Sequence, residues 1–350
     1  MTITIDDIKA TIEVIFKQRV ATLIQVGTKG RVLFCVKNSE LEAPRKRVFG
    51  SAVFTLEDEE ELEKQIKQIF GNGVKQVTVL EYPSTLSAVV EEINLIDWNW
   101  IFTTDSAEQG TIVSYCKEKQ KFGLVYNQSS ADSMYVVSCN NPSAIMSDEN
   151  ETELTTVELL PLLMGVIAGC PYDKSISYKV FTELKSVALP TTIAYGQCTL
   201  YNEEEGVRVA SPVNTLVTLG ENITEDMKSI CIVEGMQRLR EDIIYAFRTG
   251  YKGRYKNKYD NQCLFFSACN YYLEQLEELG VLDPEYDNHV DVNVKKQRQM
   301  WIASGKDPDE INNMSDLEIK KLTYKKMVYP LVNAKFLDAI EGMSMEVEMY

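Results

Sequence analysis

The chain has 350 residues, a length that fits two domains of ordinary size. Hydrophobic residues make up 45% of it and charged residues 25%, which excludes a disordered, collagen-like or low-complexity chain. The formal net charge of −16 argues against nucleic acid or an anionic membrane as the main partner, because both are bound by basic surfaces.

The N-terminal residues contain two short apolar runs, 2–5 (TITI) and 11–17 (TIEVIFK), that have the pattern of strand pieces. Acidic residues stand where a secretory signal carries its basic region. The longest uncharged apolar stretch, residues 159–170, is too short to span a bilayer as a helix. We therefore treat residues 1–29 as an N-terminal arm, and we expect a chain that is made in the cytoplasm and has no membrane segment.

Residues 30–150 predict an α/β domain. Within them, residues 55–70 predict a helix that is capped by Thr55, begins with acidic residues and ends at Gly71. Strands that alternate with helices indicate a mostly parallel sheet. Five apolar runs rich in β-branched and aromatic residues have the length of buried strands: 32–36, 74–80, 100–102, 122–126 and 134–139.

Residues 151–350 predict a separate α+β domain. The polar, acidic residues 147–156 (SDENETELTT) suggest the boundary, close to residue 150. A helix follows, with Pro161 near its first turn. The turn residues NEEEG at 202–206 then predict a hairpin, and two long helical patterns cover residues 226–247 and 262–279.

The sequence contains no enzyme motif. It lacks the glycine-rich phosphate loops of nucleotide enzymes and the GxSxG motif of hydrolases. The single histidine, His289, lies in a polar segment without a nearby nucleophile, which favours a structural role. Asp287, Asp291 and Asn293 alternate like metal ligands but lack the glycine and glutamate of a calcium loop. The eight cysteines form no CxxC pair and are expected to be buried reduced thiols, so we expect no catalytic, cofactor or metal site.

Residues 238–258 are basic within an acidic chain, with seven basic residues against two acidic ones. Basic side chains are favourable at a helix C-terminus because of the helix dipole, and this structural explanation stays open. The alternative is a cationic surface for an acidic partner. We call its expected residues, Arg248, Lys252, Arg254 and Lys256, the basic strip.

Residues 342–350 predict a strand with one apolar face, because Met343, Met345, Val347 and Met349 alternate with serine and glutamate. Such a strand either completes a sheet of its own subunit or adds to the sheet edge of another molecule. The alternation alone is compatible with both.

Several segments, in this order, resemble the contractile tail sheath proteins of phages. They are LLMGVIAGCPYDKSISYKVF, GVRVASPVNTLVTL, IVEGMQRLREDI, GRYKNKYDNQ, WIASGKD and FLDAIEGMSMEVEMY. The sequence is most similar to the short sheaths of Gram-positive defective prophages and R-type, diffocin-like bacteriocins. The resemblance covers about residues 159–350 and rests on several ordered segments rather than on one signature.

The resemblance implies a structural subunit and not an enzyme. Such subunits form stacked hexameric rings around a tail tube, and the sheath contracts to drive the tube through a target cell envelope. The implied partners are further copies of the chain, the tube protein, and the baseplate and tail terminator proteins, with no nucleic acid, membrane or cofactor. The particle would be assembled in the cytoplasm and released by lysis as a phage tail or tail-like particle.

The resemblance also implies that terminal strands are exchanged between subunits and that the basic strip faces the tube. The exchanged C-terminal strand would be residues 342–350, and position makes residues 30–150 an outer domain. The alternatives are another self-assembling tail component or, less favoured, a cytosolic α/β enzyme. The N-terminal strand falls at one of two places, around Ile3 and Ile5 or around Ile12 and Val14.

Overall fold

The computed structural model describes residues 24, 29–128, 130–192, 195–347 and 349. The chain divides into two compact units, and each contains two separate stretches of sequence. The sheet unit comprises Thr28–Glu234 and Asp338–Tyr350, and the helical unit comprises Met1–Gly27 and Gly235–Leu337.

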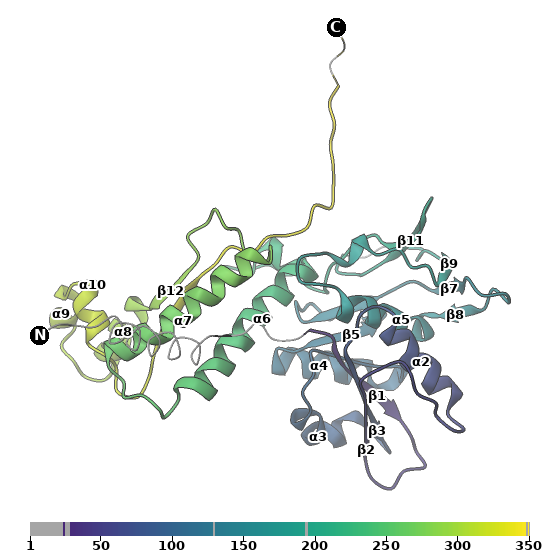
Figure 1. Cartoon of the computed structure of the whole chain (residues 1–350), viewed down its shortest axis with the longest axis horizontal. Coiled ribbons are helices and arrows are strands. Elements are labelled where there is room, and N and C mark those ends of the chain that lie inside the picture. The colour runs from purple at the N-terminus through teal and green to yellow at the C-terminus, as the bar shows by residue number, and fades with distance from the viewer. Residues whose placement is uncertain (1–23, 25–28, 129, 193–194, 348, 350) are drawn as a thin grey trace, which may run out of the picture. The chain divides into compact units, whose positions relative to one another are not determined.

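The sheet unit is built on a six-stranded, mostly parallel sheet, as the alternating pattern predicts (Figure 1). Neighbouring strands pair in parallel, except that β2 runs antiparallel to β3 at one edge. The strands lie in the order β2 (Arg45–Phe49), β3 (Gln76–Tyr82), β1 (Arg31–Lys37), β4 (Trp100–Thr103), β5 (Phe122–Tyr126) and β6 (Val136–Cys139).

Helices cover both faces of this sheet. On one face, α2 (Glu60–Phe70) and α5 (Thr156–Gly169) pack against Phe34 and Phe102, whose rings stack with centroids 4.4 Å apart. On the other face lie the 3-10 turns Leu86–Val89 and Ser106–Glu108, with α3 (Val90–Leu95) and α4 (Gln109–Lys119). Successive residues of β1 alternate between the two cores, as expected for a strand buried on both faces.

The helices α2 and α5 approach closely because two glycines of α5 lack side chains. A Cβ at Gly165 would lie 2.6 Å from the carbonyl oxygen of Ile69, and one at Gly169 would lie 1.9 Å from that of Asn72. A larger residue at either position therefore requires backbone movement.

The rest of the sheet unit is antiparallel. Strands β8 (Glu153–Thr155), β7 (Ser143–Met146) and β9 (Leu184–Val187) form a three-stranded sheet in that order. The predicted hairpin is present as β10 (Leu200–Glu203) and β11 (Gly206–Val209). Two 3-10 turns, Ile176–Tyr178 and Glu225–Lys228, complete the unit.

The division into units does not follow the boundary expected near residue 150. One continuous core runs from Val32 to Val233. The acidic residues that suggested a linker form the β7–β8 turn instead, and β8 leads directly into α5 through a capping box between Thr155 and Glu158. Since α5 is buried along almost its whole length, residues 156–169 belong to the same core as the first strands.

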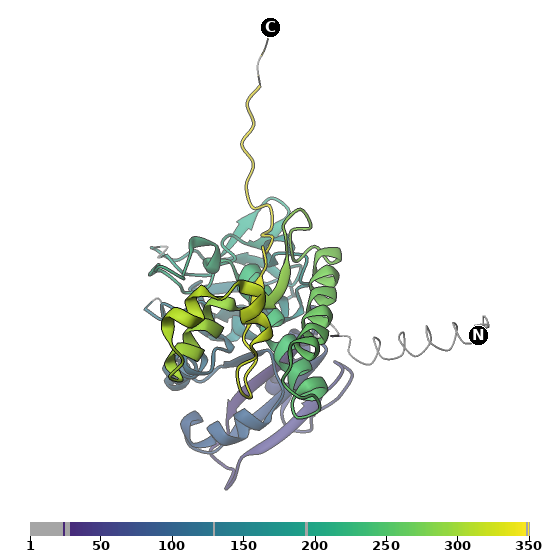
Figure 2. The same cartoon turned by 90° about the vertical axis from the view of Figure 1, so that its left-hand side faces the viewer.

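The helical unit contains most of α6 (Ile230–Ala246), a π-helical turn (Phe247–Tyr251) and the long α7 (Tyr259–Glu278). Two short strands, β12 (His289–Val292) and β13 (Pro330–Asn333), form an antiparallel pair. Between them in sequence, α8 (Val294–Ala303), α9 (Pro308–Asn313) and α10 (Asp316–Lys321) gather into a group of short helices (Figure 2).

The structure corrects two local expectations, reveals one strand that was missed and leaves the C-terminal segment without a strand partner among the described residues of this chain. Thr55 does not cap α2, because the helix begins at Glu60 and its N-cap position is Glu59. Pro161 lies inside α5 and not in its first turn. The strand β2 was not predicted, because its sequence RKRVF is charged and mostly exposed. No strand is formed by residues 342–347, which continue an extended segment after Leu337 (Figure 1).

Candidate assembly surfaces

The residues that could have suggested enzyme or metal chemistry have structural partners. His289 lies in β12, with Nδ1 3.0 Å from the carbonyl oxygen of Asp287. Asp291 pairs with Lys320, and Asn293 caps α8 by accepting a hydrogen bond from the Lys296 N–H at 2.8 Å. Among the described residues, no group of acids, cysteines and histidines has a metal-binding arrangement.

The eight cysteines are unpaired thiols, six of them buried and two half-buried. Burial raises the pKa of Cys139 and Cys231 to about 11 and that of Cys170 and Cys269 to about 12. A thiol that stays protonated is a poor nucleophile, so these cysteines behave as small core residues.

We expect Cys269→Ser and His289→Ala to assemble like the unchanged chain. Cys269 is fully buried, so its replacement should lower the free energy of unfolding by about 1–2 kcal/mol, whereas His289→Ala should have a smaller effect. Urea unfolding measures the free energy of unfolding of each variant, and electron microscopy measures its assembly. Contraction of purified particles that depends on added nucleotide would contradict the absence of catalysis.

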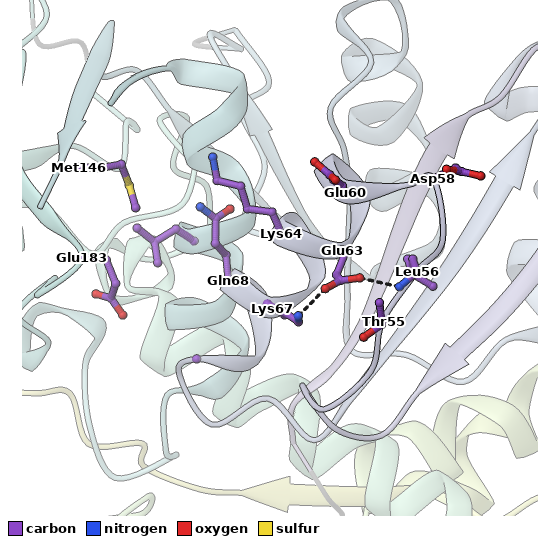
Figure 3. A pocket seen from close by; sticks show the side chains of 12 residues that line it. Thr55, Leu56, Asp58, Glu60, Glu63, Lys64, Lys67, Gln68, Met146 and Glu183 are labelled. Carbon is purple, nitrogen blue, oxygen red and sulfur yellow. Dashed lines mark hydrogen bonds and ion pairs between the residues drawn. The ribbon is translucent and has the colours of Figure 1, made fainter. Parts of the chain in front are cut away.

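A pocket of about 740 Å³ lies against α2 (Figure 3). Two of its charged side chains pair: Glu63 accepts a hydrogen bond from Lys67 and a second one, of 2.5 Å, from the Leu56 N–H. These two bonds hold the pKa of Glu63 below its usual range. Glu60, Lys64 and Glu183 also line the pocket, and its lining contains no serine, cysteine or histidine.

Five strongly exposed apolar side chains lie together in the segment after Leu337. Met343, Met345, Val347 and Met349 are between 70% and 91% exposed, and Ile340 is 95% exposed. In the part of the chain that the structure describes, no strand pairs with this segment. An apolar face left in water by the folded chain is typical of an interaction surface.

The outer edge of β12 is closed within the chain. The Val290 N–H donates to Asn270 Oδ1 at 2.5 Å, and Asn270 Nδ2 donates to the Val290 carbonyl at 3.3 Å. Asn270 belongs to α7, so this helix occupies the outward backbone groups of Val290, and the Val292 N–H donates to Asp291 Oδ1 at 2.6 Å.

The outer edge of β13 is unpaired among the described residues. Val332 lies opposite Val290, so its N–H and C=O also point away from the pair. The same alternation continues beyond β13, because Lys335 accepts from the Asp283 N–H at 2.9 Å and Leu337 donates to Val281 at 3.0 Å. Outside the β12–β13 pairing, no described residue bonds the backbone of Val332, Ala334 or Phe336. We call residues Pro330–Leu337 the open edge.

The basic strip lies at the end of α6 and in the loop that follows. Arg248 belongs to the π-helical turn, and Lys252, Arg254 and Lys256 come after it, around Gly253 with its φ of +77°. All four are exposed, and none forms an ion pair with a described residue. The helix dipole acts only within the last turn, so it explains Arg248 but not the other three.

Sequence reasoning identified the apolar alternation and the basic strip but missed the open edge. The alternating apolar residues of KMVYPLVNAKF were the available signal for β13. The direction of backbone hydrogen bonds leaves no trace in such a pattern. The N-terminal candidates Ile3, Ile5, Ile12 and Val14 lie outside the described residues.

No helix among the described residues is both long and apolar enough to span a bilayer. Residues 223–349 match the family model for the phage tail sheath C-terminal domain. The chain is 24% identical over 276 residues to the tail sheath protein of Clostridium phage phiCD119, which covers 75% of this chain and 74% of the relative.

Solved sheath structures have the same fold. The helical sheath of the anti-feeding prophage in its contracted state matches with a TM-score of 0.66 and 14% identity, over 94% of this chain and 95% of that one. The sheath tail protein of Desulfitobacterium hafniense matches with a TM-score of 0.62 and 14% identity. The match covers 77% of this chain and 91% of that one. In sequence and in fold the chain is therefore a relative of the contractile tail sheath proteins, a structural subunit and not an enzyme.

Proposed function

We propose that the chain polymerises by strand exchange into stacked hexameric rings around a tail tube and that contraction of this polymer drives the tube through a target envelope. The observation that carries the proposal is that one chain holds both halves of a strand-addition junction. These are the open edge and the unpaired apolar segment Gly342–Met349. Similarity to a sheath in its contracted state supports the contraction.

The two halves have matching lengths, and their apolar side chains fall on the same side of the extended sheet. An antiparallel register that sets Gly342 opposite Leu337 extends along the whole open edge. It pairs Met343, Met345 and Val347 with the three edge residues whose backbone groups point outward: Phe336, Ala334 and Val332. Residues opposite each other share a face, so the apolar side chains of the donated strand fall on the side of the buried Val290.

The residues that precede the segment form side-chain contacts within the sheet unit. Ser229 Oγ donates to Asp338 Oδ1 at 2.9 Å, and Ser177 Oγ donates to Glu341 Oε1 at 2.9 Å. Both bonds attach residues 338–341 to the sheet unit, whereas the open edge belongs to the helical unit.

Strand exchange suits a machine whose subunits must move without separating. About four to six backbone hydrogen bonds, each worth a net ~0.5–1.5 kcal/mol, together with the apolar face hold the junction while the subunit bodies rotate. The energy is stored in the metastable assembled state, so contraction requires no nucleotide.

The remaining parts of the chain take the following places in this proposal. The basic strip faces the tube, and residues 30–150 lie on the outer side of the polymer. A second exchanged strand comes from the N-terminal residues, around Ile3 and Ile5 or around Ile12 and Val14. The baseplate and terminator proteins bind the two ends of a polymer that assembles in the cytoplasm and leaves the cell by lysis. The proposed kind of particle is a phage tail or a tail-like particle, such as an R-type bacteriocin or a defective prophage.

Charge reversal of the basic strip should uncouple the sheath from its tube. We expect Arg248→Glu with Arg254→Glu to give empty, already contracted sheath. Each lost contact is worth up to ~1 kcal/mol, and many such contacts align the rings. Because these contacts are exposed, we expect added salt to weaken them. The control reverses Lys75 and Lys117, which are also exposed and form no ion pair with a described residue. Extended sheath on tubes at normal yield from the Arg248/Arg254 variant would mean that the strip faces another partner.

Electron microscopy of the chain coexpressed with its tube protein tests the proposal as a whole. We expect hollow helical polymers with six subunits per ring that surround a thinner tube. Narrow tubes or a baseplate-like ring made of this chain alone would favour the alternative of another tail component. A ligand-bound monomer or dimer would favour the cytosolic enzyme.

A further inference from the structure

A small pocket lies beside the residues that lead into β13. It has a volume of about 280 Å³, and its wall includes the aromatic rings of Tyr251, Tyr255 and Phe265. Residues 326–328, which precede β13 by only one residue, also line it. Pockets for cofactor-sized ligands span roughly 300–1,000 Å³, so this one is suited to a single side chain.

The polar groups of this pocket define the side chain that it can hold. Gln262 is 3% exposed, and its Nε2 donates to Asn257 Oδ1 at 2.7 Å, but its Oε1 has no partner among the described residues. A buried carbonyl oxygen without a donor is unfavourable, so the occupant should supply an N–H or O–H. Lys252, Lys256 and Lys326 make the surroundings positive. These features fit an aromatic ring that carries a hydrogen-bond donor and belongs to an acidic segment.

We infer that the pocket binds the side chain of Tyr350 from a second copy of the chain. The inference rests on the proposed strand exchange. In the register that sets Gly342 opposite Leu337, Tyr350 lies opposite Tyr329, next to the pocket residue Val328. The phenol then donates to Gln262 Oε1, and the Glu348 carboxylate lies on the side of Lys326, a pocket residue that does not belong to the basic strip. The pocket thereby fixes the register of the donated strand, which a uniform apolar alternation leaves free to slip by two residues.

Binding of synthetic peptides separates this inference from strand exchange itself. The receptor is the full chain with Val347→Pro, whose own segment cannot occupy the edge. A labelled peptide of residues 342–350 should bind, and its Tyr350→Ala version should bind roughly 30-fold more weakly, the factor for losing a buried aromatic anchor. The Tyr350→Phe version should fall between them. If the Ala peptide binds as tightly as the unchanged one while a Val347→Pro peptide does not bind, the pocket inference is wrong and strand exchange stands. If no peptide binds, both are wrong.

Charge exchange tests the pocket residues. Lys326→Glu in the receptor should weaken binding of the unchanged peptide. Glu348→Lys in the peptide should restore its affinity for this receptor. Lys325→Glu is the matched control, because Lys325 is adjacent in sequence but does not line the pocket. Circular dichroism of each receptor checks that it is folded. If Lys326→Glu abolishes binding of the tube protein and leaves the peptide affinity unchanged, the pocket belongs to an acidic segment of the tube and the inference is overturned.

Discussion

Replacing Val347 with proline should leave the subunit folded and soluble but block polymerisation nearly as completely as deletion of Gly342–Tyr350. Val347 is 71% exposed, so the substitution disturbs no core of its own chain. In the proposed register its N–H donates to the open edge at Val332, and proline removes that donor and strains the strand. Circular dichroism measures folding, size-exclusion chromatography measures solubility and the monomeric state, and electron microscopy measures polymerisation.

Glu346→Pro is the matched control for this prediction. The backbone N–H of Glu346 points away from the acceptor in the same register, and proline is tolerated at such edge positions. We therefore expect Glu346→Pro to retain most of the assembly that Val347→Pro loses. Equal loss in both variants would contradict the register. A misfolded aggregate from the deletion would mean that the segment completes its own subunit, and normal sheath would exclude both roles.

Gly169→Ala should destabilise the sheet unit by about 3 kcal/mol, at the upper end of the cost of overpacking. The added Cβ would meet the Asn72 carbonyl carbon at 2.7 Å as well as its oxygen, and both are backbone atoms that no side-chain rotation can move. The thermal unfolding midpoint should fall by roughly 6–12 °C.

Gly110→Ala provides the control for Gly169→Ala. Gly110 also lies in a helix, but a Cβ there meets nothing within 4 Å. Alanine has the higher helix propensity, so this change should raise stability by up to about 1 kcal/mol. Differential scanning calorimetry of the two variants compares them directly. A Gly169→Ala protein as stable as the unchanged chain would mean that the contact between α2 and α5 is looser than described.

The strands of the parallel sheet were predictable because each is buried on both faces and appears as an apolar run. The exposed β2 gave no such signal, since Arg45 and Arg47 read as loop residues although they pair with Glu81 of β3. The boundary at residue 150 failed because charge alone does not separate a linker from a tight turn between β7 and β8. The alternation of Met343 to Met349 predicts a strand, but a side-chain pattern contains no information about which molecule provides the partner.

The asymmetry between the closed edge of β12 and the open edge of β13 sets the binding valence of the subunit. In the proposed C-terminal exchange, each chain would offer one acceptor through its open edge and one donor through residues 342–350, and these are different surfaces. Two chains that meet through them form a heterologous contact, which leaves one donor and one acceptor unsatisfied at the ends. Growth through this junction stops at a dimer only when the rotation between the two chains is a half turn, so that they exchange strands reciprocally. It ends only when the rotation per subunit closes a ring or when another protein occupies the last free edge.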